Sequence, residues 1–433
     1  MRTRYRYSEV EKVFKFVHCA DLHLDSPLRG LSALSDAPAE EIRTATRKAL
    51  QNLVDLCIAE GVAFVVIAGD VYDGDWEDYT TGLFFSRTMA RLRDHGIQVF
   101  LIRGNHDAAS QISRRLTLPD NVKEFRTDMP ETVKLDDLGV AIHGQSFASR
   151  AVTENLAANY PPPEPWMFNI GILHTAAEGQ EGHEPYAPCR VEELVQKGYQ
   201  YWALGHIHKR QVLHSDPYII FPGNIQGRHV REEGEKGCTL VTVDGLAVTV
   251  EHRNLDVLRW FTCHVDLSGA ETVEDFSTLV QGAIAEIADE HSLYRLALRV
   301  VCHGQTALHG DILDDPERYV NEVENAASVV GGDHIWIEKV KFETTHARAD
   351  GLTEGMDVEG LNGRIMQALQ RAEEDEDFVN DFLRHTKGLQ GSLRDYLQSP
   401  DATRVDSTED VARLLEDARM LLLTMMTKGG VHR

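Results

Sequence analysis

The sequence predicts an α/β domain, followed by a small α+β domain and a helical C-terminal region. Three observations support this prediction. Short apolar runs alternate with amphipathic helical patterns from residue 13 to residue 206. The strand signal then returns on either side of two further helical patterns, and it disappears from about His346 onward. We therefore expect domain boundaries at residues 1–255, 256–345 and 346–433.

The first domain is predicted to repeat a strand, a loop and a helix. Residues 63–68 are uniformly apolar, which is typical of a strand buried on both faces. Further strands are expected at residues 13–17, 98–102, 140–144, 170–174 and 201–206, and helices from about Pro38 to Gly61 and from Thr80 to His95. After Gly205, turn signals at Asp216-Pro217 and Asp244-Gly245 predict hairpins.

The rest of the chain divides into a mixed part and a helical part. The mixed part is predicted to place strands at residues 260–267, 294–302 and 334–342, and helices at residues 272–289 and 316–327. The helical part is acidic, and its last helix is expected to start with the capping pair Ser407 and Asp410 and to stop at Gly429. This helix has a wide apolar face, made of Val411, Leu414, Leu415, Ala418, Leu421, Leu422, Leu423, Met425 and Met426. Core packing and a partner groove both stay open as explanations of that face.

The composition is that of a globular protein without a membrane segment. No apolar run approaches the roughly 20 residues that a bilayer-spanning helix needs. The basic N-terminus is not followed by an apolar stretch, so no signal peptide is expected. The six cysteines stand singly, which indicates neither a zinc ribbon nor a redox dithiol and favours reduced thiols in a cytoplasmic protein.

The formal net charge of −25 bears on the class of substrate. It argues against a protein that grips nucleic acid through its own overall field. An enzyme acting on nucleic acid is still compatible with it, if metal ions, local arginines or a partner subunit meet the phosphates.

Polar residues gather just past the ends of the predicted strands, where sites form in α/β sheets. The pattern consists of Asp-x-His, Gly-Asp-x-x-Asp, Gly-Asn-His-Asp, a single histidine and Gly-His-x-His, in this order. Each piece alone is a weak signal, but five in succession at strand ends predict one metal centre. Its candidate ligands are Asp21, His23, Asp70, Asn105, His174, His206 and His208.

This mixture of ligands indicates phosphate-ester hydrolysis. Two divalent ions about 3.5–4 Å apart activate water and neutralise charge on the phosphate. Ions that close need a bridging carboxylate, for which Asp70 is the natural candidate. Imidazole, carboxylate and amide together suit manganese, iron or zinc better than calcium or magnesium. Gly69, Gly104 and Gly205 are expected to let the backbone turn sharply before the ligands.

The five motifs resemble those of the calcineurin-like metallophosphoesterases over roughly residues 13–255. Three stretches bring the sequence closest to the SbcD/YhaO-type DNA repair exonucleases, namely residues 18–27, residues 183–189, and Gly205-His-Ile-His-Lys with residues 222–229. The resemblance implies a β-sandwich flanked by helices. Residues 256–345 are similar to the capping module of these nucleases, and the C-terminal helices occupy the place where such proteins dock on an SbcC-like, SMC-related coiled-coil ATPase.

The resemblance also implies roles for the site residues. One ion would take Asp21, His23, Asp70 and His208, and the other Asp70, Asn105, His174 and His206. His106 would be the catalytic histidine, oriented by Asp73 or Asp107. The implied activity is that of a manganese-dependent DNA nuclease. Relatives form homodimers through helices that correspond to Thr80–His95, with Phe84, Phe85, Met89 and Leu92, and to Ala108–Leu116.

Several alternatives stay open. Lys209, Arg210, Arg228 and Arg231 are either contacts for substrate phosphates or ordinary surface charges. His143 is interpreted as a buried histidine with satisfied nitrogens, and His183 and Cys189 as anchors of a loop. A small-molecule phosphodiesterase or phosphatase acting on nucleotides or lipid diphosphates would share every catalytic residue. A non-catalytic scaffold is disfavoured because no ligand position is missing.

Overall fold

The computed structural model describes residues 13–26, 28, 39–73, 79–109, 117–177, 186–245 and 247–346, together with parts of the C-terminal region, namely residues 364, 367–368, 371–372, 375–392, 405, 407–412, 414–415 and 418. The chain forms two compact units. One contains residues 1–262 and 291–298, and the other contains residues 263–290 and 299–433. The division into three domains at residues 255 and 345, which the sequence suggests, stays a prediction.

Two six-stranded sheets form the centre of the first unit. The first sheet has the order β12-β11-β1-β2-β3-β4, and the second sheet has the order β5-β6-β7-β8-β10-β9. Strands β1 to β4 are parallel, as are β6, β7, β8 and β10. The bounds in the first sheet are β1 Phe14–Cys19, β2 Phe64–Ala68, β3 Gln98–Ile102, β4 Val122–Glu124, β11 Gly237–Asp244 and β12 Ala247–Asn254. Those in the second sheet are β5 Glu131–Leu135, β6 Val140–Gly144, β7 Phe168–His174, β8 Tyr201–Gly205, β9 Gln211–Ser215 and β10 Tyr218–Phe221.

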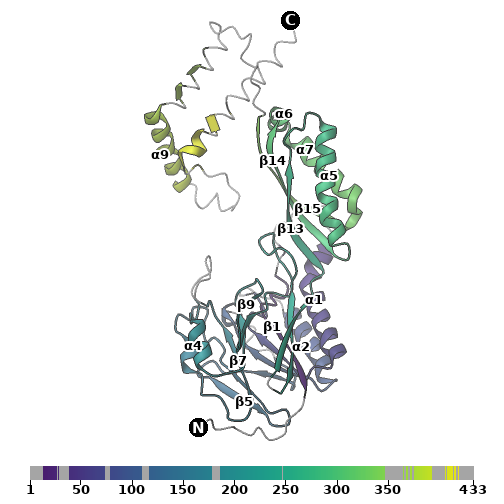
Figure 1. Ribbon diagram of the computed structural model, residues 1–433, viewed down its shortest axis with the longest axis vertical. Coiled ribbons are helices and arrows are strands. Elements are labelled where there is room, and N and C mark those ends of the chain that lie inside the picture. Colours follow the sequence, from purple (N-terminus) through teal and green to yellow (C-terminus); the bar gives the residue numbers. More distant parts are fainter. Residues whose placement is uncertain are drawn as a thin grey trace. The chain divides into compact units, whose positions relative to one another are not determined.

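Helices cover the outer faces of both sheets (Figure 1). Helices α1 (Ala39–Glu60) and α2 (Tyr79–Arg93) pack on the first sheet, where Leu53 and Phe85 meet Val65 in one apolar cluster. On the second sheet, α4 (Val191–Gln196) and the short 3-10 helix η2 (Leu156–Asn159) pack against Trp202. The short helix α3 (Asn105–Ala109) follows β3 directly. The result is the predicted sandwich of two sheets flanked by helices.

Aromatic and aliphatic side chains fill the space between the sheets. The Phe16 and Phe64 rings of the first sheet stack with centroids 5.0 Å apart, and Tyr201 of the second sheet meets Phe16 edge-on. His18 adds a polar link, since its ring nitrogens lie 3.0 Å from the Tyr201 hydroxyl and 3.1 Å from the Leu204 carbonyl oxygen. Burial lowers the pKa of His18 to about 3, so this histidine is neutral. The contact fixes the two sheets against each other near their carboxyl ends.

The mixed α+β part has the elements that the sequence predicts. A three-stranded sheet has the order β13-β14-β15, with bounds β13 Leu258–Asp266, β14 Arg295–Thr306 and β15 Ile335–His346. Helices α5 (Val273–Glu290) and α7 (Pro316–Gly331) pack together through Phe276 and Tyr319, whose rings meet edge-on at 5.0 Å. The short helix α6 (His309–Asp314) and the 3-10 turn η3 (Gly332–His334) complete this part.

In the C-terminal region, helix α9 (Glu376–Ser392) is the longest described element. Ser407 and Asp410 form the predicted capping box, with reciprocal backbone-to-side-chain hydrogen bonds of 2.9 and 3.2 Å. Val411 and Leu415 pack with Val405 against α9. Part of the predicted apolar face is thus used inside the chain. Leu421, Leu422, Leu423, Met425, Met426 and Gly429 lie outside the described residues.

The apolar surface expected for a homodimer is mostly internal. Phe85, Met89 and Leu92 of α2 are fully buried in the cluster between this helix and the first sheet. Phe84 is partly buried and packs on the same cluster. Three of these four apolar residues thus pack on the sheet, because the amphipathic face of α2 is the one that covers it, and a homodimer stays a prediction. Residues 110–116 of the second predicted interface segment lie outside the described residues.

Candidate metal centre

The predicted ligands meet at one edge of the sandwich. Asp21 and His23 follow β1, Asp70 follows β2 and Asn105 follows β3, while His174 ends β7 and His206 and His208 follow β8. Because these strands are parallel within each sheet, their carboxyl ends lie along the same edge. All seven side chains belong to residues that are buried or half-buried.

Asp21, His23 and His208 form the first group. Each offers one ligand atom, and the three atoms lie within 4.8 Å of one another. The Nε2 atoms of His23 and His208 face each other at 3.2 Å. This is the separation, roughly 3–3.5 Å, of two imidazole nitrogens that bind one ion at bond lengths near 2.1 Å.

Asp21, Asp70 and His174 form the second group within the same limit. His174 Nε2 lies 3.4 Å from Asp70 Oδ2 and 2.9 Å from Asn105 Oδ1. The same Asp70 oxygen is 4.0 Å from His23 Nε2, so Asp70 stands between the two groups. The backbone N–H of His206 donates to both carboxylate oxygens of Asp21. The imidazole rings of His206 and His174 have their centroids 5.3 Å apart.

In His23, His174 and His208, the ring nitrogen Nδ1 lies against a hydrogen-bond acceptor. His23 Nδ1 donates to Asp73 Oδ1 at 2.7 Å, and His174 Nδ1 donates to the Ala68 carbonyl at 2.9 Å. His208 Nδ1 lies 2.7 Å from Glu232 Oε1. Such partners fix the tautomer, leaving the Nε2 lone pair free for an ion. Glu232 was not found from the sequence, because it lies 24 residues beyond His208 in a loop without strand or helix periodicity.

His106 lies at the opening of the site and is oriented by Asp73. Its side chain is 35% exposed, and its Nδ1 lies 3.5 Å from Asp73 Oδ1. Asp107 instead accepts hydrogen bonds from the backbone N–H groups of Val71, Tyr72 and Gly104. Between the two candidates named for orienting His106, these contacts favour Asp73. Asp107, through its hydrogen bonds to the backbone, instead connects the loops after β2 and β3.

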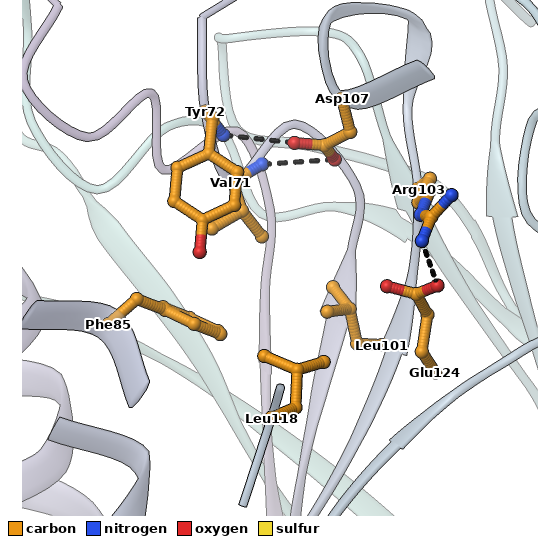
Figure 2. A pocket seen from close by; sticks show the side chains of 8 residues that line it. All are labelled: Val71, Tyr72, Phe85, Leu101, Arg103, Asp107, Leu118 and Glu124. Atoms are coloured by element: carbon orange, nitrogen blue, oxygen red, sulfur yellow. Dashed lines mark hydrogen bonds and ion pairs between the residues drawn. The ribbon is translucent and has the colours of Figure 1, made fainter. Parts of the chain in front are cut away.

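Asp107 also lines a small cavity behind these loops. Figure 2 shows its two hydrogen bonds to Val71 and Tyr72, with the Arg103–Glu124 ion pair on the opposite wall. The cavity has a volume of about 20 Å³, which is room for a single water molecule. It is therefore not a substrate pocket.

The backbone at the site adopts conformations that are rare for residues with a side chain. Asp21, His23, Asp70 and His206 have φ angles of 51°, 40°, 52° and 105°. Residues in this region cost about 1–3 kcal/mol each and persist where the surroundings over-determine them. Such a cluster is characteristic of functional sites.

The glycines before the ligands serve two different purposes. Gly69, with a φ of 96°, makes the sharp turn expected of it. Gly104 and Gly205 lie outside the left-handed region, so the expectation of a glycine-dependent turn is wrong for them. A Cβ on Gly104 would collide with the Asp70 carboxylate, and one on Gly205 with the Ala68 carbonyl oxygen. Close packing at the site excludes a larger residue there.

The electrostatics of the site fit a bound cation. Burial lowers the pKa of His23 to about 3, so its ring is neutral, and its Nε2 lone pair faces His208 Nε2. Burial raises the pKa of Asp21. Burial alone would disfavour the charged forms of Asp70 and His174. The attraction between the two groups outweighs this effect of burial, so it lowers the pKa of Asp70 and raises the pKa of His174 to about 9. A proton on His174 thus compensates buried carboxylates, and divalent ions suit the same donor set.

The four predicted basic contacts differ in their surroundings. Lys209 and Arg231 are exposed and Arg210 is half-buried. Arg228 alone of the four has described contacts at the site, with its Nη1 atom 3.6 Å from Asp73 Oδ1 and its Nη2 atom 2.9 Å from Glu232 Oε1. Arg228 thus contacts Asp73 and Glu232, the acceptors of the Nδ1 hydrogen bonds of His23 and His208.

His143 and Cys189 are buried side chains with hydrogen-bond partners in the core. His143 is buried, with its ring nitrogens 2.8 Å from the Thr132 hydroxyl and 3.0 Å from Asn169 Oδ1, as expected for a satisfied core histidine. Cys189 is buried beside the Thr175 hydroxyl. All six cysteines are buried free thiols. His183 lies outside the described residues. No helix in the described part of the chain has the length and apolar character needed to cross a bilayer.

Comparison with known proteins agrees with this site. Residues 14–210 match the calcineurin-like phosphoesterase family, and residues 260–345 match the middle domain of metallophosphoesterase YhaO. The DNA double-strand break repair protein Mre11 of Methanopyrus kandleri is 25% identical over 393 residues, covering 83% of this chain and 77% of that protein. Mre11 of Sulfurisphaera tokodaii is also 25% identical, over 48% of this chain and 57% of its own.

Among solved structures, a dimetal phosphatase from Danio rerio aligns with 56% of this chain and 96% of its own, at a TM-score of 0.35 and 13% identity. The uncharacterized metallophosphoesterase YhaO of Bacillus subtilis is 36% identical over 293 residues, which cover 67% of this chain and 71% of that protein. With this similarity and the two domain matches, the chain belongs to the YhaO family of metallophosphoesterases.

Proposed function

We propose that this metallophosphoesterase is a DNA nuclease with a dinuclear, manganese-preferring centre, working in DNA repair or end processing. The observation that carries the proposal is the position of Asp70 between two groups of ligands, with Oδ2 at 3.4 Å from His174 Nε2 and 4.0 Å from His23 Nε2. One ion would be held by Asp21, His23, Asp70 and His208, and the other by Asp70, Asn105, His174 and His206. Ions bound there lower the pKa of the attacking water and neutralise charge on the phosphate.

The residues of the chain contribute positioning and proton transfer. Asp70 keeps its second oxygen in place by accepting a hydrogen bond from the backbone N–H of His106 at 2.9 Å. This bond ties the loop that carries His106 to the ligand between the two groups. His106, half-exposed and backed by Asp73, is placed to stabilise the transition state or to protonate the leaving oxygen.

DNA as substrate is supported by the relatives named as DNA double-strand break repair proteins. The net charge of −25 opposes unaided binding to a polyanion. We therefore propose that an SbcC-like coiled-coil ATPase docks on the C-terminal helices and supplies the surface that grips DNA. A homodimer and a cytoplasmic location complete the proposal, although the internal packing of Phe85, Met89 and Leu92 leaves α2 less apolar surface for pairing.

The acidic charge also favours a second candidate, a small-molecule phosphodiesterase acting on nucleotides or lipid diphosphates. The two are separated by assaying the manganese-loaded chain on a chromogenic diester, on nucleotides, and on single-stranded, duplex and hairpin DNA. We expect cleavage of the diester and of at least one DNA form, both abolished by a chelator. Hydrolysis of the small substrates with no cleavage of any DNA form, even with the ATPase present, would establish the second candidate instead.

A further inference from the structure

Glu232 is a buried carboxylate that contacts the candidate ligand His208. Its side chain is 6% exposed and lies in the loop between β10 and β11. Oε1 lies 2.7 Å from His208 Nδ1 and 2.9 Å from Arg228 Nη2. Oε2 accepts from the Asn224 amide at 2.9 Å and from the Arg228 backbone N–H at 2.8 Å. The Arg228 Nε atom adds a third, longer contact to Oε2 at 3.4 Å, so hydrogen bonds at both oxygens hold the carboxylate in one orientation.

This orientation decides which tautomer His208 adopts. A carboxylate oxygen only accepts, so His208 must carry a proton on Nδ1, and Nε2, 3.2 Å from His23 Nε2, is the nitrogen left to bind an ion. Arg228 Nη2 also lies 3.0 Å from His208 Nδ1. Since both groups are donors, their shared acceptor is Glu232 Oε1, and neither donates to the other.

Arg228 lies between the Glu232 carboxylate and the Asp73 carboxylate, which contacts His23. Its guanidinium contacts Glu232 and lies 3.6 Å from Asp73 Oδ1, the acceptor of the His23 Nδ1 proton. Two histidines of the same ligand group are thus each backed by a carboxylate, and one arginine lies between the two. His174 is different, because its Nδ1 proton goes to the neutral Ala68 carbonyl.

We propose that Glu232 is a positioning residue of the metal centre, acting through His208 to set the affinity of one of the two ions. The inference rests on the proposed dinuclear centre. A negative partner makes the imidazole a better donor, and loss of such a partner typically weakens metal binding about 10- to 100-fold. His174 is hydrogen-bonded to Ala68 and Asn105 and not, in the described part of the chain, to Glu232, so we expect the affinity for the second ion to be unchanged.

The test is calorimetric titration of the chelator-stripped full chain with manganese alone. Glu232→Gln keeps the shape but removes the charge, and we expect one of two binding steps to weaken about 10- to 100-fold. Glu338→Gln is the matched control, because it removes a buried glutamate that pairs with Arg299 through two contacts of 2.8 Å. Its two manganese affinities should equal those of the unaltered protein.

Thermal unfolding separates positioning from a merely structural role. If Glu232 only stabilised the fold, Glu232→Gln would lower the melting temperature in chelator and leave the rise on adding manganese unchanged. We expect that rise to shrink, and Glu232→Asp, which keeps the charge, to restore part of it.

Two results would overturn the inference in distinguishable ways. Two unchanged affinities in Glu232→Gln, beside two-ion binding by the unaltered chain, would refute the role of Glu232 alone. Failure of the unaltered chain to bind manganese at all would refute the proposed function, and the inference with it.

Discussion

Replacing Gly104 with alanine tests how closely the metal centre is packed. The backbone at Gly104 is outside the left-handed region, so alanine is conformationally acceptable there. The added Cβ would collide with Asp70 Oδ1 and lie 2.8 Å from Asp70 Cγ and from His174 Cε1, whereas ordinary contact begins at 3.4 Å. His174 or the loop must therefore move by about 0.6 Å, and the Asp70 carboxylate by more than that. Catalytic groups have to be held within about 0.5 Å, and a 1 Å misplacement can cost about 100-fold in rate.

We expect Gly104→Ala to lower kcat for a chromogenic diester by roughly 10- to 100-fold while the protein remains folded by circular dichroism. Gly282→Ala is the control, because Gly282 lies in α5 with nothing within 4 Å of the added Cβ. It should stabilise the helix by about 0.5–1 kcal/mol and leave kcat unchanged. Full activity of Gly104→Ala, with both ions bound, would refute the close-packing argument.

Three further changes probe the site and the tail. Asp70→Asn should abolish both metal occupancy and turnover, and elemental analysis finding two ions with activity intact would remove Asp70 from its bridging role. His106→Gln should keep its metal but lose about 100- to 10,000-fold in kcat; loss of metal at an unchanged rate per ion would instead make His106 a ligand. Deleting residues 404–433 removes Val411 from its contact with α9, and should abolish co-purification of the ATPase while diester hydrolysis persists. Loss of basal hydrolysis would assign the helix to the core.

The sequence predicted the architecture well where the signals are local. The helix expected from Pro38 begins at Ala39, and the one expected at residue 316 begins at Pro316. Buried parallel strands such as Phe64–Ala68 are uniformly apolar, so their positions and the polar residues after them are visible without a structure. The candidate ligands could be picked out because each ends or follows such a strand, and the structure brings them together at one edge.

The elements that were missed have no comparable signal. Strand β4 has three residues, all half-buried, and β5 (Glu131–Leu135) contains two charged residues. Both are edge strands of their sheets, where side chains need not be apolar. Apolar periodicity likewise could not tell whether Phe85 of α2 faces a partner or the same chain, since both surfaces require the same residues.

The support behind the ligands depends on tertiary contacts, which one sequence does not reveal. Asp21 and His23 are held by backbone hydrogen bonds of 3.0 Å to the Gly69 and Asp70 carbonyls, so the loops after β1 and β2 pair like a short extension of the sheet. Asp107 accepts hydrogen bonds from the backbone N–H groups of Tyr72 and Gly104, and so connects the loop after β2 to the loop after β3. These bonds over-determine the left-handed backbone at Asp21, His23 and Asp70 and offset its cost. Hydrogen bonds of the chain itself thus hold the loops that carry these three candidate ligands.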